Sequence, residues 1–456
     1  MRTHTCPLLL LALVICLPLL AGSCPKQGAS RQGAATTSPA IKTQAPAAEV
    51  SATEEAELPV AAENGPAADW REDLAFLATE LPARHIDFFA QLDPADWDAA
   101  VAELDSELDE LSEAEIVMRL MYLVAMAGDS HTALDISGRD LHVFPLQLYW
   151  FEDGLWVTGA AADQADLIGW RLVEIDGTEA AEAADLISQL YAYENYSQYV
   201  KMAPSYLVVS ELLNALDITD SVEEATFTFE DDFAEQRQRV KLTAVSPQDK
   251  PEMVSWVENF KHPPVYLEQV NNPYFCKYLP DMRMLFLQYN ACVERPELSL
   301  NEFAGMVSDM ADQFEFDTFV VDLRFNGGGD SALAAPLIDV IAGDPRINVR
   351  DRLFVIIGRN TFSSAVLNAL ELKRRTHALF VGEPTGGRPN HFGELKTFEL
   401  PNSGLTVYYS TKYFMHSDVD TDSLEPDICA VEFSADILGG YDPALIEIDN
   451  YRAGLD

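Results

Sequence analysis

The sequence has few basic residues, and this shortage excludes several kinds of partner. It carries 30 lysines and arginines against 74 aspartates and glutamates, which gives a formal net charge of −44 over 456 residues. Nucleic acids and anionic membrane surfaces bind basic protein surfaces, so neither is expected as a partner. The excess of acid is typical of a well-solvated surface, with salt adaptation as the alternative interpretation. The hydrophobic fraction of 48% predicts a large core, divided over two or three domains.

Metal-binding patterns are also missing. None of the eight histidines lies in a His-Glu-x-x-His motif, and no Cys-x-x-Cys occurs. We therefore expect no metal and no other cofactor.

No apolar run is long enough for a comfortable membrane span, but the first residues are typical of an export signal. Arg2 is followed by an apolar stretch from Pro7 to Ala21 and by small residues up to Ser23, so residues 1–23 are predicted to be a signal peptide. Cys24 follows directly, and LAGSC resembles a bacterial lipoprotein signal, which implies lipidation at Cys24. Cleavage after Ser23 without lipidation is the alternative.

The next segment, 24–66, is rich in Ala, Pro, Thr, Gln and Ser and reads as a flexible tether. We expect an exported protein in the periplasm or at the cell surface, which reaches the membrane only through its lipid anchor. Three cysteines, an odd number, would then remain, so no disulfide framework is implied and one pair at most. They are Cys276, Cys292 and Cys429.

Residues 67–139 are predicted to be a helical domain. Three amphipathic helices are expected, at 70–85, 94–111 and 113–126, and Ser112 with Glu115 forms a capping box at the start of the third. The third helix runs into Gly128-Asp129-Ser130-His131-Thr132. A glycine cap leaves Ser130 and His131 in a loop after a rigid element, where functional residues are frequent. A single histidine is more often structural than catalytic.

A smaller module rich in strands is predicted over residues 140–250. Strands are expected at 154–160, 171–178, 227–230 and 240–245, with a helix at 180–190 and a helical insertion at 196–216. The segment GWRLVEIDGTEAAEAADLI resembles the middle of a PDZ domain, which implies a groove for a peptide terminus.

Residues 251–456 alternate between strands and helices and are predicted to form an α/β core. Expected elements are a strand at 282–290, a helix at 298–313, a strand at 316–325 and a helix at 332–341. The turn Asn326-Gly327-Gly328-Gly329 then lies at a helix N-terminus, where backbone amides can approach an anion. It lacks the Lys-Ser/Thr ending of a phosphate-binding loop. The glycines either turn the chain or supply an oxyanion donor.

Ser363 is the first candidate nucleophile. A buried strand at 353–357 leads into a polar turn, and a helix is predicted at 364–374. A serine on such a turn lies beside unpaired amide groups. The alternative is that Ser363 or Ser364 only caps the helix, which is the commoner role.

Three motifs in order, DLRFNGGG, RNTFSSA and GEPTGGRPNHFGE, resemble those of the tail-specific (C-terminal-processing) and tricorn-type serine peptidases. The resemblance covers nearly everything from about Asp69 to Asp427. It implies a crotonase-like α/β core of repeated strand-strand-helix units. It also implies Ser363 as nucleophile, with the amides of Ser364 and of Gly327 or Gly328 as the oxyanion hole.

The sequence departs from the processing proteases at Arg388, where that family has its catalytic lysine. Arginine stays protonated and cannot be the general base. Tricorn-type members use a histidine preceded by serine, which Ser130 and His131 match, together with a distant acidic residue. That residue would be one of Asp418, Asp420 and Asp422. His391 is a second possible base.

The resemblance implies an exported serine peptidase that hydrolyses peptides or proteins through an acyl-enzyme. Arg388 would bind a substrate carboxylate. Two alternatives remain: a peptide-binding pseudopeptidase, which the arginine makes plausible, and an acyl-thioester enzyme on the same fold, which fits poorly with export.

Overall fold

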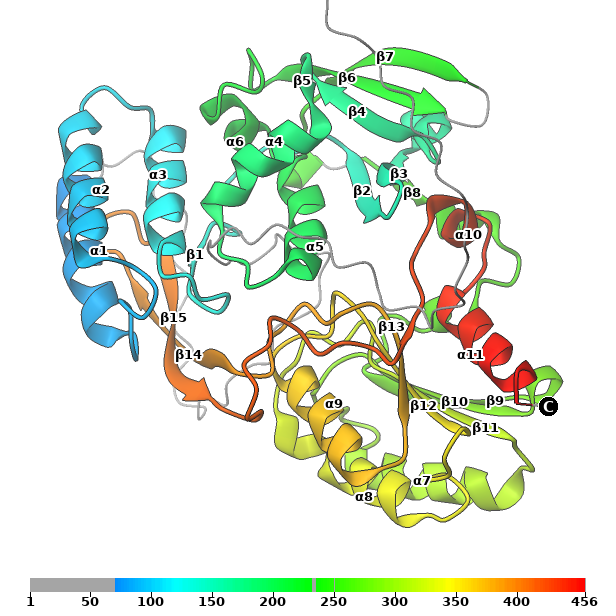
Figure 1. Ribbon diagram of the computed structural model, residues 1–456. Helices are drawn as coiled ribbons and strands as arrows, with labels where there is room; N and C mark the ends of the chain where they lie inside the picture. The colour runs from blue at the N-terminus through cyan, green and yellow to red at the C-terminus, as the bar shows by residue number, and fades with distance from the viewer. Residues whose placement is uncertain (1–69, 232–234, 250, 456) are drawn as a thin grey trace, which may run out of the picture.

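The computed structural model describes residues 70–231, 235–249 and 251–455. The predicted signal peptide, the lipidation site at Cys24 and the tether lie outside the described residues. None of the helices found within these ranges has the length and apolar character needed to cross a membrane. The described chain is a mixed α/β structure with three sheets (Figure 1).

The C-terminal part of the chain contains a six-stranded sheet in the order β16-β13-β12-β11-β10-β9. Its strands are β9 (Tyr274–Leu279), β10 (Met284–Tyr289), β11 (Thr318–Asp322), β12 (Leu353–Ile357), β13 (Leu379–Gly382) and β16 (Ile428–Cys429). Only the β9–β10 pair is antiparallel. β10, β11 and β12 are buried along their whole length, as expected for apolar strands covered on both faces.

Helices cover both faces of this sheet (Figure 1). One face packs against α7 (Leu300–Gln313), α8 (Ala335–Gly343) and α9 (Ser364–Arg375), and the other against α11 (Pro443–Ala453), which follows the short α10 (Ser434–Leu438). Successive strand residues point to opposite faces, so Val321 packs under α7–α9 while Val320 packs under α11. The predicted helices of this region are confirmed to within a turn.

The middle of the chain forms an antiparallel sheet in the order β2-β3-β4-β6-β7. Its strands are β2 (Leu146–Phe151), β3 (Gly154–Ala161), β4 (Arg171–Ile175), β6 (Glu224–Asp231) and β7 (Gln236–Thr243), with short β5 (Thr178–Glu179) on β4 and β8 (Met253–Ser255) on β3. The strand predicted at 171–178 is interrupted by a tight turn at Asp176-Gly177, with φ values of 46° and 94°, which joins β4 to β5. The helices are α4 (Ala180–Ile187), α5 (Tyr196–Tyr206) and α6 (Ser210–Ala215).

The N-terminal helices pack against a hairpin from the far end of the sequence. The helices are α1 (Trp70–Arg84), α2 (Pro94–Glu107) and α3 (Glu113–Ala125), and the predicted capping box of α3 is confirmed. β1 (Ala133–Asp135) pairs with β15 (Thr406–Phe414), which pairs with β14 (His391–Glu399). Buried Asp73 of α1 accepts hydrogen bonds from the amides of Asn402 and Ser403, both at 2.8 Å. Apolar residues of these helices, the hairpin and the middle sheet form one continuous core.

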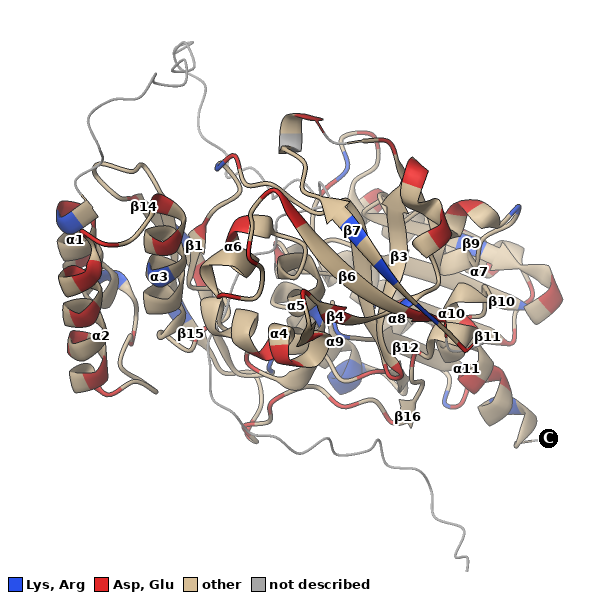
Figure 2. Cartoon of the chain, turned by 90° about the horizontal axis from the view of Figure 1, so that it is seen from above, with Lys and Arg blue, Asp and Glu red and all other residues tan. Residues whose placement is uncertain are grey.

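Acidic residues are spread over the helices and loops in the view of Figure 2, rather than gathered in one segment. Many of them are paired with the few basic residues. Cys276 and Cys292 are free thiols.

Candidate active site

Ser363 lies at the N-terminus of α9, directly after the turn that leaves β12. Its backbone has φ 51° and ψ −126°, which residues other than glycine rarely adopt. Such a conformation costs ~1–3 kcal/mol and persists only where the surroundings impose it. The Ser363 hydroxyl makes no capping hydrogen bond to the helix. The strained serine is therefore at the cap position without acting as a cap.

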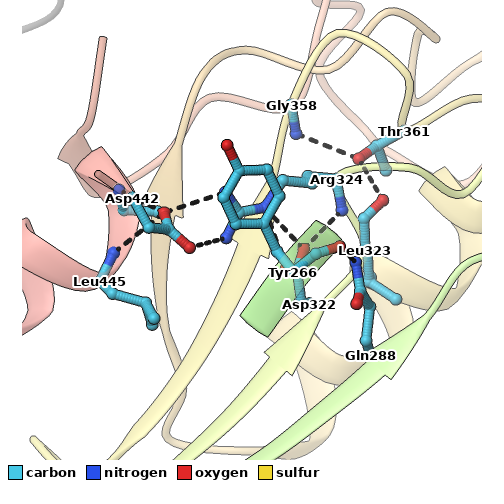
Figure 3. A network of polar contacts seen from close by, with 10 residues as sticks. Tyr266, Gln288, Asp322, Leu323, Arg324, Gly358, Thr361, Asp442 and Leu445 are labelled. Atoms are coloured by element: carbon cyan, nitrogen blue, oxygen red, sulfur yellow. Dashed lines mark hydrogen bonds and ion pairs between the residues drawn. The ribbon is translucent and has the colours of Figure 1, made fainter. Parts of the chain in front are cut away.

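Hydrogen bonds to the neighbouring strand hold this turn in place (Figure 3). The Thr361 hydroxyl donates to the carbonyl of Leu323 at 2.9 Å and accepts from the amide of Gly358 at 3.1 Å. The Phe362 amide donates to the carbonyl of Asn326 at 3.1 Å. These contacts tie the turn after β12 to the turn after β11.

A buried ionic cluster fixes the end of β11 (Figure 3). The Arg324 guanidinium donates to both oxygens of Asp322, at 3.1 and 2.9 Å, and to both oxygens of Asp442, each at 2.9 Å. It also lies 4.4 Å from the centre of the Tyr266 ring. The two carboxylates and the guanidinium are buried. Because Asp442 is bound in bidentate geometry and Asp322 by a bifurcated bond from Nε, the cluster holds the Arg324 guanidinium in place.

The glycine turn contacts Ser363. Gly328 has φ 109°, and a Cβ at this position would lie 3.0 Å from the Ser363 Cβ and 3.2 Å from the Ser364 amide nitrogen. Only glycine fits such a backbone without strain. The Gly328 amide donates to the Asn326 side chain at 3.0 Å, and the Ser364 hydroxyl donates to the Gly329 carbonyl at 2.5 Å. The predicted oxyanion-hole residues therefore meet at one place.

His131 lies on the other side of the same turn. Its ring stacks on Phe362, the residue before Ser363, with centroids 4.6 Å apart and the planes at 20°. His391 stacks in parallel with His131 at 5.5 Å. The buried Nε2 of His131 has no hydrogen-bond partner among the described residues, whereas its Nδ1 lies 3.5 Å from the Ser130 hydroxyl. The ring thus presents one nitrogen to its own loop and leaves the other unused.

Asp129, fully buried, organises the histidine loop. It accepts from His85 Nε2 at 3.1 Å, from the Thr132 hydroxyl at 2.6 Å and from the His131 amide at 2.9 Å. Burial would raise the Asp129 pKa, but the His85 hydrogen bond and the charge on His131 outweigh burial and lower the pKa to about 2. Burial lowers the pKa of His131, and the Asp129 charge opposes this. His131 is therefore a neutral imidazole near pH 7, with Nε2 able to accept a proton.

Glu194, which precedes α5, is the carboxylate that contacts Ser130. The Ser130 hydroxyl donates to Glu194 Oε1 at 2.7 Å, and the Ser130 amide at 3.3 Å. Burial and the nearby Asp129 raise the pKa of Glu194 to about 7, although the Ser130 hydrogen bonds and the charge of Arg388 act against them. Sequence reasoning missed Glu194, because it lies just before the predicted helical insertion, in a segment that carries no motif.

Two of the three aspartates considered as support for the base are ion-paired with Arg388. The Arg388 guanidinium pairs with Asp420 and with Asp422, both at 3.2 Å. The Arg388 carbonyl accepts from His391 Nδ1 at 2.8 Å. Burial and the charge of His131 lower the pKa of His391 to about 4. Arg388 thus connects the second histidine, the acidic run and, through its charge, Glu194.

A group of potential metal ligands lies in the same place. Asp129, His131 and Glu194 each have one ligand atom within 4.8 Å of the others. The Asp129 oxygens are engaged by His85, Thr132 and the His131 amide, and Glu194 Oε1 by Ser130. Since hydrogen bonds within the loop account for this cluster, we assign no ion to it.

The fold occurs in solved structures, although the sequence is distant. No family model matches the chain, and no curated protein matches it. Mature CPAF complexed with lactacystin matches with a TM-score of 0.60 at 13% identity, over 85% of this chain and 98% of that one. Mature CPAF matches with a TM-score of 0.58 at 14% identity, over 84% and 96%. A photosystem II D1 C-terminal processing protease gives a TM-score of 0.40 at 14% identity, over 84% and 97%.

This chain shares the fold of the tail-specific serine peptidases. The resemblance that the three motifs indicated is thereby confirmed at the level of the fold.

Proposed function

We propose that this chain is a serine peptidase that hydrolyses peptide bonds through an acyl-enzyme on Ser363. One observation carries the proposal. The ring of His131, with an unoccupied Nε2, lies against Phe362, and the next residue is a strained serine whose hydroxyl does not cap its helix.

The residues suggest the following sequence of events. His131 Nε2 takes the proton of Ser363 as its Oγ attacks the peptide carbonyl. The amides of Ser364 and Gly327 hold the developing oxyanion, because the Gly328 amide already donates to Asn326. His131 then returns the proton to the leaving amine. Water, activated by the same imidazole, hydrolyses the ester.

A relay of hydrogen bonds supports the imidazolium that forms. His131 Nδ1–H donates to the Ser130 hydroxyl, which donates to the Glu194 carboxylate. We therefore propose Glu194 in the supporting role, with Asp420 and Asp422 as partners of Arg388. Arg388 acts through its charge, as a cation cannot be the base.

We further propose that the peptidase works outside the cytoplasm, tethered through a lipidated Cys24 and the segment that follows it. The C-terminal α/β unit would be the crotonase-like core, and the middle sheet with α4 a PDZ-like substrate guide. Mass spectrometry of the mature N-terminus tests the anchor, and an unmodified Cys24 would contradict it.

A serine-directed fluorophosphonate tests the catalytic proposal. The probe should label the purified protein at Ser363, as located by peptide mass spectrometry, and the Ser363→Ala variant should not be labelled. Labelling must be accompanied by hydrolysis of a fluorogenic peptide mixture. A chain that is neither labelled nor hydrolytic, yet retains peptides, would be the pseudopeptidase instead.

A further inference from the structure

Lys201 of α5 is a half-buried cation next to the turn that carries Ser363. Its Nζ lies 5.7 Å from the centre of the Phe362 ring, the ring on which His131 stacks. The side chain is partly shielded from solvent, and burial lowers its pKa to about 8. Lys201 thus places a positive charge near the ring of Phe362, the residue that precedes Ser363 in the sequence.

Lys201 forms no ion pair with any of the described residues. Lys261 and Lys396 have none among these residues either, but both are exposed, whereas Lys201 is half-buried. Other lysines do have acidic partners, such as Glu224 for Lys241 and Glu268 for Lys277. Arg388, the other cation near the site, is neutralised by two aspartates. In a protein with 74 acidic residues, Lys201 is left without one at the site where substrate must bind.

The helix that carries Lys201 is fixed to the catalytic core. The Asn195 side chain caps α5 by accepting from the amide of Gln198 and donates to the carbonyls of Thr385 at 3.0 Å, Gly386 at 3.2 Å and Asp422 at 2.7 Å. The position of the ammonium relative to Ser363 is therefore built into the fold.

An ammonium that is partly desolvated and unpaired is destabilising, and a contact with an aromatic ring offsets only ~0.5–2 kcal/mol. An anionic ligand would satisfy it. We propose that Lys201 binds a carboxylate of the peptide substrate beside the scissile bond, so that the enzyme selects peptides with an acidic side chain or a free C-terminus at that position. This inference rests on the proposed function, because it places the substrate at Ser363.

Matched peptides test the proposal. Each quenched fluorescent peptide is made with Glu, Gln or Lys at one position near the cleaved bond, and with a free or an amidated C-terminus. Ionic strength is ~0.15 M, where the Debye length of about 8 Å suppresses long-range repulsion by the acidic surface. The wild type should favour one carboxylate form over its neutral match by roughly 10- to 100-fold in kcat/KM, the range of a charged hydrogen bond. The Glu–Gln and acid–amide pairs tell the two sources apart.

Variants at position 201 assign the preference. Lys201→Met should bring the carboxylate-to-neutral ratio to about one, Lys201→Arg should keep it above one, and Lys201→Glu should favour the Lys peptides. Lys241→Met, which removes an exposed and paired lysine, should retain the wild-type ratio. A wild type without carboxylate preference, or a Lys201→Met variant that keeps it, overturns the proposal. If Lys201→Arg loses turnover of every peptide, Lys201 acts in the chemistry and the proposal is equally wrong.

Equilibrium binding separates this inference from the proposed function. Ser363→Ala should bind the same peptides with the same order of preference, and the double variant with Lys201→Met should lose that order. If the wild type neither hydrolyses peptides nor reacts with the fluorophosphonate, the peptidase proposal fails, and the binding ratio still decides the role of Lys201.

Discussion

The two halves of the site are built differently. The nucleophile and the glycine turn lie at the carboxyl ends of β12 and β11, two central strands that are buried on both faces and braced by the Arg324 cluster (Figure 3). The proposed base His131, with Ser130 and Glu194, comes from loops around α3 and α5. One half is held by the core of a sheet, and the other by docking between elements.

Several docking contacts between the halves are polar. Asn195 reaches the backbone after β13, and the Arg359 guanidinium pairs with Glu383 and donates to the Trp150 carbonyl of β2. The hairpin β14–β15 crosses from the core to the N-terminal helices, and His391 at its start stacks on His131 (Figure 1). The strained backbone of Ser363 needs the rigid support of the half built on β11 and β12, which we call the rigid half. The position of the proposed base depends instead on the contacts that dock the other half, the docked half, against it.

The largest effect on activity is expected from substitutions that remove one catalytic candidate from each half of the site. Ser363→Ala and His131→Ala should each lower kcat by ~10⁴-fold or more, and the double variant should be little worse, because the two act as one unit. Steady-state hydrolysis measures this, with His377→Ala, a change at an exposed histidine, as the control. If His131→Ala keeps near-normal turnover, His391 becomes the next candidate for the base.

The next test breaks the support of the rigid half. Asp442→Ala leaves the Arg324 charge partly unpaired in a buried site and should cost ~3–5 kcal/mol of unfolding free energy. Urea denaturation followed by circular dichroism measures it. Asp339→Ala, which removes a solvent-exposed partner of Arg375, should change stability little. Similar midpoints for both variants would show that the buried cluster is not what holds the end of β11.

A smaller change tests the contact between the two turns. Gly328→Ala introduces a Cβ where the Ser363 Cβ is 3.0 Å away and φ is 109°, so the oxyanion donors should shift. Losing one such donor lowers kcat by ~10²–10³-fold. Gly305→Ala in α7 meets no atom within 4 Å and should leave kcat unchanged while raising stability slightly. Equal activity of both variants would contradict the assigned oxyanion hole.

Sequence reasoning found the rigid half because its signals are local. The apolar strands, the Asn326–Gly329 turn and the Ser363 turn are each encoded within about ten residues, and the motifs around them identified the fold. The expected role of His131 also came from a short motif, but its partner did not. One of Asp418, Asp420 and Asp422 was expected to support the base because of a resemblance in order along the chain, and the structure pairs Asp420 and Asp422 with the cation Arg388.

Glu194 could not be predicted in this way, because it lies 64 residues from Ser130 and reaches it through tertiary packing alone. The pairing of β15 with β1 is non-local for the same reason: neither strand's sequence specifies its partner. The partners within the docked half could therefore be identified only from a structure, whereas the residues of the rigid half could be identified from the sequence.

The last prediction concerns the docked half and uses pH. Glu194, with a pKa of about 7, is ionised above that pH and protonated below it, while the pKa of His131 is lowered from its usual value of 6.5. Only the ionised carboxylate of Glu194 accepts a strong hydrogen bond from the Ser130 hydroxyl. The rate of fluorophosphonate labelling at Ser363 should therefore fall as pH drops through about 7. A second fall, due to protonation of His131, should follow at lower pH.

Glu194→Gln should remove the fall near pH 7 and lower the plateau by roughly 10- to 100-fold, the range of a charged hydrogen bond. Glu194→Asp, which keeps a titrating carboxyl, should retain the fall. The charge of Asp129 raises the pKa of Glu194, and the charge of Arg388 lowers it. Arg388→Gln removes a cation that favours the ionised carboxylate, so the fall in labelling rate should move to higher pH. A fall near pH 7 that persists in Glu194→Gln would belong to His131 itself, and Glu194 would then only position Ser130.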